Sequence, residues 1–439
     1  MEIDIKKRFF NVGGRKLRLA VLAAFVCGQG LALAETNALS LAQVLDAARN
    51  NFDIAQARGA VAAARADIVA ADRPPFPILS VKLSSIDLQN GVGAGDWLRA
   101  KRVDKGVGID WAWERGDKRA LRTQVAQRAA DAVQADMEEN VVQQLLAASN
   151  AFYDLAAAQE RESNVTSSAT GTALIAEIAA RRVRAGDLAH QDELRLEIEA
   201  ERAKGEVVTA KLDRKRAMLI LGSLMGLTTL PVSLRAQVKW PQPGDTTAKA
   251  EFTEAAMQDF VNARSDLRAA AERVAAARSA LDSASAQKKA DVTWGVSLDH
   301  FPGTSTRLLE LRMQMPLQFG YEYQGEIGRA QGQLEAAEFA LEKARHAARA
   351  DFLGLLAQLQ SSAERSQSFE QAILPRAREV ASQAEFAYAK GALALNDLLD
   401  ARRTLRLVSL DALTTQAEYA KAIVALRIRT RPAFSLTND

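Results

Sequence analysis

The sequence predicts an α+β fold in which β-hairpins alternate with very long α-helices, in two successive copies. Three observations support this prediction. Long stretches without proline have apolar residues at spacings of three and four, as packed helices do. Shorter stretches alternate apolar and polar residues, as strands with two unlike faces do. The pentapeptide VAAAR at residues 61–65 occurs again at residues 274–278 and indicates an internal two-fold repeat.

The composition fits packed helices and excludes one class of protein. Lys and Arg number 57, and Asp and Glu number 54, so the chain lacks the clustered basic excess of nucleic-acid-binding proteins. The charged residues are interspersed with many alanines, which is typical of long packed helices. Aromatic residues make up 6% of the chain, which argues against a large aromatic core.

The N-terminus has the pattern of an export signal. A basic segment, residues 6–18, precedes an apolar run at residues 19–26 that is too short to span a bilayer as a helix. The tripeptide ALA at residues 32–34 matches an A-x-A cleavage site. We therefore expect residues 1–34 to be a signal peptide and the mature chain to begin near Glu35. The alternative is a buried N-terminal helix.

The single cysteine, Cys27, lies inside this predicted signal. Bacterial lipoproteins attach their lipid to such a cysteine, but Val26 differs from the small residue that usually precedes it. We expect simple cleavage, and lipidation of Cys27 stays open as the alternative. Cleavage would remove the one thiol, so the mature chain would contain neither a disulfide nor a thiolate metal site. No later segment is predicted to be a transmembrane helix.

Alternating segments predict two hairpins, with strands at about residues 78–89 and 105–114, and at about 291–300 and 307–317. Pro316 marks the end of the last strand. A sheet packed on soluble helices would also alternate. Strands of about ten residues with aromatics on the apolar face also fit a transmembrane β-barrel. Because about eight strands form the smallest such barrel, several chains would have to combine, and three would give twelve strands.

The helices are the longest predicted elements. Residues 117–185 contain no proline, and one helix over them would be roughly 100 Å long at about 1.5 Å per residue. A second long helix is predicted over residues 322–390, with a kink at Pro375. Gly186 and Gly391 follow the two helices, at positions where glycine favours a helix end. Such lengths suit a coiled-coil tube across the periplasm.

These elements divide the chain into two repeats, residues 35–225 and 251–430. Each repeat is predicted to contain a helix, a hairpin, a long helix, a tip turn and a returning helix. Residues 226–250, rich in proline, form an irregular linker or equatorial segment between them. Residues 431–439 are predicted to be a C-terminal tail.

The chain resembles the TolC family of outer-membrane efflux proteins over residues 38–430. The resemblance rests on a predicted first helix that runs from Ser40 to Pro74, on both hairpins and on the two tips. The most specific feature is YAKG at residues 388–391, followed by DLLDA at residues 397–401.

Within that family, ERGDKR at residues 114–119 resembles the heavy-metal branch, the outer-membrane components of cobalt–zinc–cadmium efflux systems. The resemblance implies a homotrimer with a twelve-stranded β-barrel in the outer membrane and a twelve-helix tunnel in the periplasm. It implies a periplasmic adaptor protein and an inner-membrane proton-driven RND pump as partners. It also implies no cofactor and no enzymatic activity, because the pump supplies energy and selects the substrate.

The resemblance implies a pore constriction formed by Asp397 and Asp400. Three copies would place six carboxylates around a narrow entrance, which would attract cations. The alternative is that both are ordinary solvated helix carboxylates near the start of the helix that follows Gly391.

The resemblance also implies contacts that close the tips, made by Asp192 and Tyr388. The arginine expected two residues after the second tip glycine is replaced by Leu393, so a familiar salt-bridge latch is incomplete. The positions implied to dock the adaptor are the two tip turns, namely Gly186, Leu188, Gly391 and Leu393.

The sequence predicts no metal site, because His190, His300 and His346 are far apart and have no partners at ligand spacing. The favoured function is efflux of heavy-metal cations. The alternatives are multidrug or solvent efflux, type I protein secretion through a channel of the same build, and, in a different class, a periplasmic coiled-coil adaptor without a pore.

Overall fold

The computed structural model describes residues 38–91, 103–228, 234–242, 253–302 and 305–430. The predicted signal peptide, residues 1–34 with Cys27, lies outside the described residues. So do the predicted tail, residues 431–439, and parts of the predicted linker.

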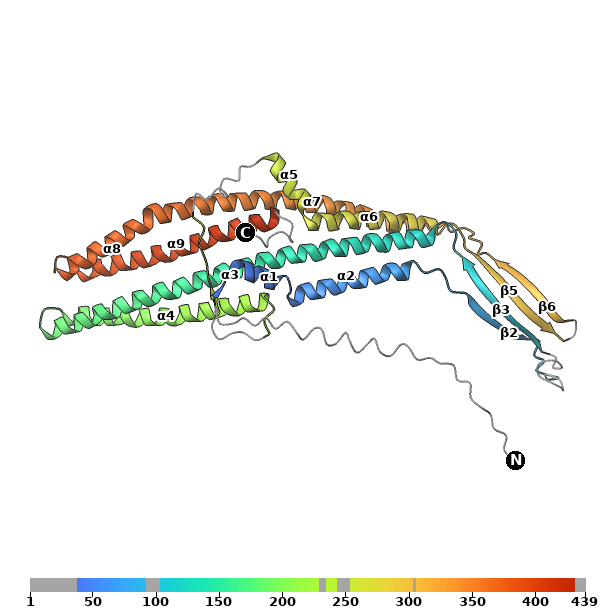
Figure 1. The fold of residues 1–439 in the computed structure, drawn as a ribbon, viewed down its shortest axis with the longest axis horizontal. Helices are drawn as coiled ribbons and strands as arrows, with labels where there is room; N and C mark the ends of the chain where they lie inside the picture. The colour runs from blue at the N-terminus through green and yellow to red at the C-terminus, as the bar shows by residue number, and fades with distance from the viewer. Residues whose placement is uncertain (1–37, 92–102, 229–233, 243–252, 303–304, 431–439) are drawn as a thin grey trace, which may run out of the picture.

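The molecule is elongated, with a β-sheet at one end and two helical hairpin tips at the other (Figure 1). Helix α3 (Lys118–Arg184) has 67 residues and spans roughly 100 Å at about 1.5 Å per residue. Along one side of it, α2 (Phe52–Ala71) and α4 (His190–Leu224) lie nearly end to end. On its other side, α6 (Ser265–Ala286) and α9 (Leu395–Thr430) do the same.

The fourth column of helices follows a curved path beside α6 and α9 (Figure 1). It consists of α7 (Gln324–Ser368), a five-residue π-helical turn, η2 (Phe369–Ile373), and α8 (Leu374–Ala389). Pro375 cannot donate a backbone hydrogen bond, and its ring crowds the carbonyl four residues earlier. The wider π turn directly before it relieves this conflict. The predicted interruption at Pro375 is thus confirmed.

The predicted single helix from Ser40 to Pro74 is wrong, because the structure has α1 (Leu41–Ala48) and a separate α2. Asn51 causes the break. Its side-chain oxygen accepts a hydrogen bond from the backbone N–H of Ile54 at 3.0 Å, which caps α2. Its amide donates to the carbonyl of Leu224 at 3.4 Å, so the break is tied to the end of α4.

The sheet has four antiparallel strands in the order β2-β3-β5-β6. The strands are β2 (Ile78–Ser84), β3 (Asp104–Trp113), β5 (Val292–Phe301) and β6 (Ser305–Gln314). The two hairpins meet where β3 pairs with β5. The first strand is shorter than predicted, because Ser85 has a left-handed backbone with φ of 60° that turns the chain out of the sheet.

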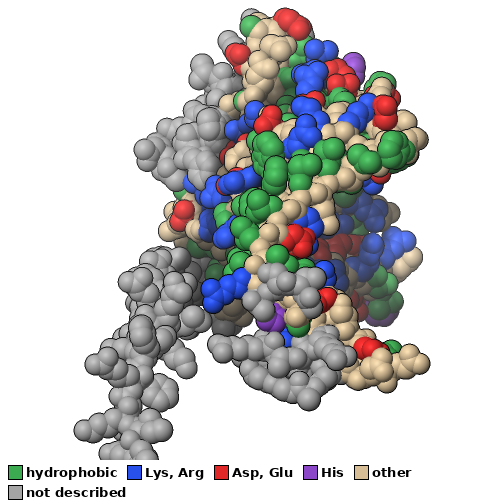
Figure 2. All heavy atoms as spheres, turned by 90° about the vertical axis from the view of Figure 1, so that its right-hand side faces the viewer, with side chains coloured by type: hydrophobic (Ala, Val, Ile, Leu, Met, Phe, Trp, Pro, Cys, Tyr) green, Lys and Arg blue, Asp and Glu red, His purple; other side chains and the backbone are tan. Residues whose placement is uncertain are grey.

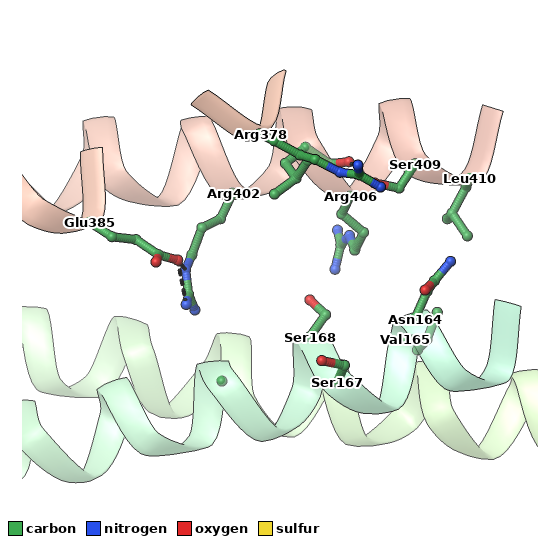
Figure 3. Close-up of a pocket in the computed structure, with 12 residues that line it drawn as sticks. Asn164, Val165, Ser167, Ser168, Arg378, Glu385, Arg402, Arg406, Ser409 and Leu410 are labelled. Carbon is green, nitrogen blue, oxygen red and sulfur yellow. Dashed lines mark hydrogen bonds and ion pairs between the residues drawn. The ribbon is translucent and has the colours of Figure 1, made fainter. Parts of the chain in front are cut away.

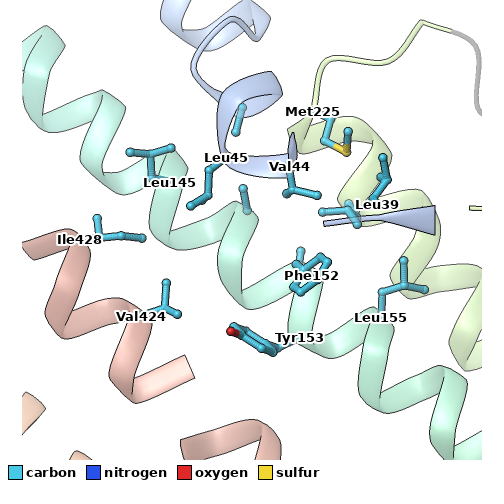
Figure 4. Close-up of a cluster of buried hydrophobic side chains, with 14 of the residues drawn as sticks. Leu39, Val44, Leu45, Leu145, Phe152, Tyr153, Leu155, Met225, Val424 and Ile428 are labelled. Carbon is cyan, nitrogen blue, oxygen red and sulfur yellow. The ribbon is translucent and has the colours of Figure 1, made fainter. Parts of the chain in front are cut away.

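The largest hydrophobic core lies halfway along the helices (Figure 4). There β1 (Ala38–Leu39) pairs in parallel with β4 (Arg235–Ala236), which belongs to the predicted linker. Side chains from six elements meet on the middle of α3, including Leu39, Val44, Leu45, Leu145, Phe152, Leu221 and Ile428. This core joins β1 and α1, the middle of α3 and the end of α9.

A smaller core lies under α5 (Glu254–Ala263), against α7. The rings of Phe260 and Phe352 lie 5.0 Å apart there. Arg264 is buried beside them and pairs with Asp266 at 2.6 Å and Asp351 at 2.9 Å. Burial alone would lower the pKa of Arg264, but the hydrogen bonds that it donates to the two carboxylates raise the pKa instead.

Candidate functional site

The sheet presents one apolar face and one polar face, because successive side chains in a strand point to opposite sides. On the apolar face, Trp111 lies opposite Trp294, which in turn lies opposite Met313. The apolar side chains here are largely exposed, and Leu311, for example, is 74% exposed. The other exposed members are Leu79, Val81, Leu83, Val107, Ile109, Trp113, Leu298 and Leu309.

Figure 2 shows the sheet end of the molecule, where hydrophobic side chains form a band between patches of charged residues. Apolar patches beyond a few hundred Å² are unusual on soluble monomers and mark surfaces that contact a membrane or a partner. No helix in the described part of the chain is both long enough and apolar enough to cross a membrane.

A short joint connects β3 to α3, and the ERGDKR segment forms it. Gly116 and Asp117 have left-handed backbones, with φ of 77° and 55°, which turn the chain sharply. Arg122 of α3 binds Glu114 at 2.9 Å and donates to the carbonyl of Ala71 at 2.9 Å. The hydrogen bond that Arg122 donates to Glu114 raises the pKa of Arg122. The segment therefore fixes the angle between the sheet and the helices.

At the far end, both hairpin tips have the same backbone geometry. Gly186 and Gly391 follow α3 and α8 with φ of 83° and 77°, which confirms that the helices end there. In each tip the next residue donates to a carbonyl five positions back, as in Asp187 to Arg182 at 2.9 Å. Both glycines are exposed, whereas Leu188 and Leu393 are half-buried against neighbouring tip residues.

Asp397 and Asp400 lie on one exposed face of the first turns of α9, while Leu395 and Leu398 are buried on the other face. Among the described residues, no side chain forms an ion pair or hydrogen bond with either carboxylate. The structure thus leaves two uncompensated negative charges at the second tip.

No hydrogen bond or ion pair joins Asp192 and Tyr388 to each other within the described chain. Asp192 forms an ion pair with Arg195 of its own helix at 3.8 Å. Tyr388, like Leu188, packs against the buried cluster of both tips, and the guanidinium carbon of Arg182 lies 6.0 Å from its ring centroid. Sequence reasoning overlooked Arg182 and Arg195, because nothing in the local pattern distinguishes them from other helix-surface arginines.

Arg195 makes a further contact between the two tips that the sequence did not predict. Its guanidinium donates to the side chain of Asn396 on α9 at 3.3 Å. The two tips are thus in contact within one chain, through Arg195 and Asn396 and also through Arg182 and the predicted residue Tyr388.

A polar cleft of about 510 Å³ lies above the tips, between α3 and the α8–α9 pair (Figure 3). Small polar residues of α3, such as Ser167 and Ser168, form one wall. Two arginines of the other wall are paired: Arg402 with Glu385 at 2.7 Å and Arg406 with Glu206 of α4 at 2.9 Å. Carboxylates thus neutralise Arg402 and Arg406, and Arg378 is a third arginine in the lining of the cleft.

Nothing in the described residues resembles a metal centre, since no group of three His, Cys, Asp or Glu side chains gathers there. His190 instead pairs with Glu193 on the same helix at 2.9 Å.

Comparison with known proteins supports a channel. Residues 44–227 match the outer membrane efflux protein family. The chain is 26% identical over 306 residues to the cobalt-zinc-cadmium resistance protein CzcC of Cupriavidus metallidurans, which covers 66% of this chain and 68% of that protein.

Solved structures share the fold. A membrane protein from Pseudomonas aeruginosa superimposes with a TM-score of 0.75 at 17% identity, covering 90% of this chain and 92% of that one. CusC, a protein whose structures were solved to follow transmembrane channel formation, superimposes with a TM-score of 0.67 at 16% identity. The match covers 89% of this chain and 91% of CusC. Residues 44–227 are thus similar to the outer membrane efflux protein family, and the chain shares its fold with solved outer-membrane channel structures.

Proposed function

We propose that this protein is the outer-membrane exit duct of a tripartite efflux system that exports heavy-metal cations. A periplasmic adaptor and an inner-membrane RND pump complete the system. The single observation that supports this best is the exposed apolar face of a sheet mounted on helices of roughly 100 Å. A lipid-embedded pore needs the first feature, and a duct across the periplasm needs the second.

The open edges of the chain support a homotrimer. Strands β2 and β6 each have one unpaired edge, and four strands are too few to close a barrel. The outer helix columns also have exposed large apolar side chains. They are Leu194, Ile198, Val208, Leu212 and Leu219 on α4, and Phe339, Leu353, Val380 and Phe386 on α7 and α8. Packing the α4 edge of one copy on the α7–α8 edge of the next closes a ring.

In this proposal the two repeats, residues 35–225 and 251–430, each supply one hairpin of the barrel and half of the helical tunnel. The middle segment, residues 226–250, serves as an equatorial strap. The backbone of Ala236 donates to Gln159 of α3 at 2.8 Å, and the indole of Trp240 donates to Glu160. A strap bonded to the longest helix would restrain the duct at its middle.

The tips would form the entrance. The exposed, unpaired Asp397 and Asp400 of three copies would narrow it and favour cations. Closing contacts would involve Asp192 and Tyr388, together with Arg195 and Arg182, which contact them. Gly186, Leu188, Gly391 and Leu393 would dock the adaptor.

The cargo rests on the similarity to CzcC, and growth assays test it. A deletion strain should become sensitive to zinc, cobalt and cadmium, and the cloned gene should restore growth. Sensitivity to drugs or solvents alone would move the substrate to the multidrug class, and a defect in an exported polypeptide would indicate type I secretion.

The architecture has its own test. The protein should fractionate with the outer membrane and migrate as a heat-dissociable trimer in detergent. A soluble periplasmic monomer would contradict the duct and would favour the coiled-coil adaptor.

A further inference from the structure

On the polar face of the sheet, a charged side chain of β6 reaches one of β3 by passing over a glycine of β5, the strand between them. Asp110 on β3, Gly295 on β5 and Arg312 on β6 are directly opposite one another in register. Because side chains alternate between the two faces, the side chains of Asp110 and Arg312 point away from the apolar Trp111–Trp294–Met313 face. Gly295 lies between them. The guanidinium of Arg312 forms an ion pair with Asp110 across the full width of the strand between them.

This ion pair lies flat against the sheet. The Asp110 side chain is 15% exposed and that of Arg312 is 35% exposed, although no second layer of the described chain is paired with this face. Arg312 also approaches Glu310 of its own strand, with Nη1 at 3.5 Å from Oε1. One guanidinium is therefore held between two carboxylates rather than extended into solvent.

Glycine at position 295 makes this arrangement possible. A Cβ there would collide with a carboxylate oxygen of Asp110 and would lie 3.2 Å from Nη2 and 3.3 Å from Nε of Arg312. A similar close approach occurs four residues further along the two strands, where a Cβ on Gly106 would collide with Asp299. Asp299 is 5% exposed and accepts a hydrogen bond from Ser297 at 2.8 Å.

The described residues of this face have more negative than positive charges. The carboxylates are Asp104, Asp110, Asp299 and Glu310, and the cations are Lys82 and Arg312. An arginine that extended freely from the wall in several copies would repel cations at close range. Holding Arg312 against the wall removes that barrier and leaves the acidic excess effective.

We infer that Asp110, Arg312 and Gly295 form a cross-strand rung that sets the ion selectivity of the outer half of the duct. Asp110 neutralises Arg312 and holds it on the wall, and Gly295 provides the space. The rung keeps the lumen favourable to cations. This inference rests on the proposed function, in which the polar face lines the lumen.

Reversal potentials of purified trimers in planar bilayers under a KCl gradient test the rung. All variants are made in an Asp397→Asn/Asp400→Asn background, so that the entrance does not mask the lumen. We expect Asp110→Asn to lower the K⁺/Cl⁻ permeability ratio about twofold and Arg312→Gln to raise it about twofold. The double variant Asp110→Asn/Arg312→Gln should return close to the background ratio.

Gly295→Ala separates the effect of the position of Arg312 from the effect of net charge. It changes no charge, but its Cβ displaces the Arg312 side chain. It should lower the permeability ratio in the same direction as Asp110→Asn. Gly328→Ala is the matched control, since nothing lies within 4 Å of a Cβ at that position, and it should leave the ratio unchanged. Comparable trimer yields on unheated gels confirm that each variant assembles.

Permeability ratios that are equal in all variants would overturn the rung while leaving the duct intact. A permeability ratio that is the same for Gly295→Ala as for Gly328→Ala would also overturn the rung. If the unmodified protein forms no channels at all, the proposed function fails, and this inference fails with it.

Discussion

The two long helical columns differ in continuity, although both run from the sheet to a tip. Helix α3 is unbroken over 67 residues, whereas α7 and α8 are separated by the π turn of η2. Helix α3 has neighbours on both sides and contributes to the largest core, while α7 and α8 form an outer edge with a smaller core. The column packed on both sides is regular, and the edge column tolerates a defect. A defect at an edge disrupts fewer contacts.

The largest effect should come from the core on α3. Phe152→Ala removes a ring that is 1% exposed at the point where six elements meet. We expect the free energy of unfolding to fall by about 3–5 kcal/mol, from lost burial and the cavity left behind. Urea titration of the detergent-solubilised protein measures it.

Phe352→Ala is the matched change on α7, at 3% exposure. Its cost should be near the lower end of that range, because the smaller core can collapse around the cavity. A larger loss at Phe352 than at Phe152 would contradict the difference between the columns.

Proline placement should show which column tolerates a break. Leu174→Pro introduces proline into α3 at a side chain that is 54% exposed, so little packing is lost. The cost should still be about 3 kcal/mol, from the missing hydrogen bond and the clash with the preceding turn.

Pro375→Ala should act in the opposite direction and allow α7 and α8 to join. We expect a gain of about 1 kcal/mol or less, because neighbouring helices are already adapted to the π turn. Calorimetry of Leu174→Pro and Pro375→Ala measures the change in stability of each variant. Equal destabilisation by the two changes would show that the columns do not differ.

Two acids, one on α6 beside the edge column and one in the π turn of that column, should respond to pH in opposite directions. Burial would raise the pKa of Asp266, but hydrogen bonds from Arg264 lower it overall. Its contribution is therefore present above the ordinary Asp pKa of 3.8 and is lost as pH falls through the lowered value. Asp266→Asn should destabilise the protein at pH 7 by about 1 kcal/mol, after allowing for solvent screening, and much less in acid.

Glu370, in the π turn, is the opposite case. Burial raises its pKa, so its carboxylate is less favourable in the folded state, and its contribution is lost as pH rises through the raised value. Glu370→Gln should stabilise the protein slightly at pH 7 and have no effect in acid. Unfolding titrations at several pH values measure both, and a parallel pH dependence would contradict the assignment.

The regular column was also the more predictable one. The proline-free pattern predicted residues 117–185, and the helix spans Lys118–Arg184. Pro375 predicted a distortion but not its π form, because the number of residues in the turn depends on the helices packed beside it. The break at Asn51 was missed, since its amide binds the carbonyl of Leu224, far away in the sequence.

The candidate sites show the same limit. Alternation in the strands indicated which residues share a face, but not that Arg312 crosses β5 to reach Asp110. Bonds of this kind join residues about two hundred positions apart, as Arg406 and Glu206 also do. Local patterns contain no information about such partners, whereas helix ends at Gly186 and Gly391 need only the local backbone.

The smallest effect on stability should come from the tip, where function rather than packing is expected to depend on the residues. Asp397→Asn/Asp400→Asn removes two exposed charges that have no partner among the described residues, so the free energy of unfolding should change by less than about 0.5 kcal/mol. If three copies surround the entrance, cation preference in single-channel recordings should nevertheless decrease, because six carboxylates are lost. The double variant Glu335→Gln/Glu338→Gln is the control, since it removes the same charge from the exposed surface of α7. Unchanged selectivity of the tip variant would mean that Asp397 and Asp400 do not line the constriction. The constriction would then have to be sought among the residues that Arg195 contacts, Asp192 and Asn396.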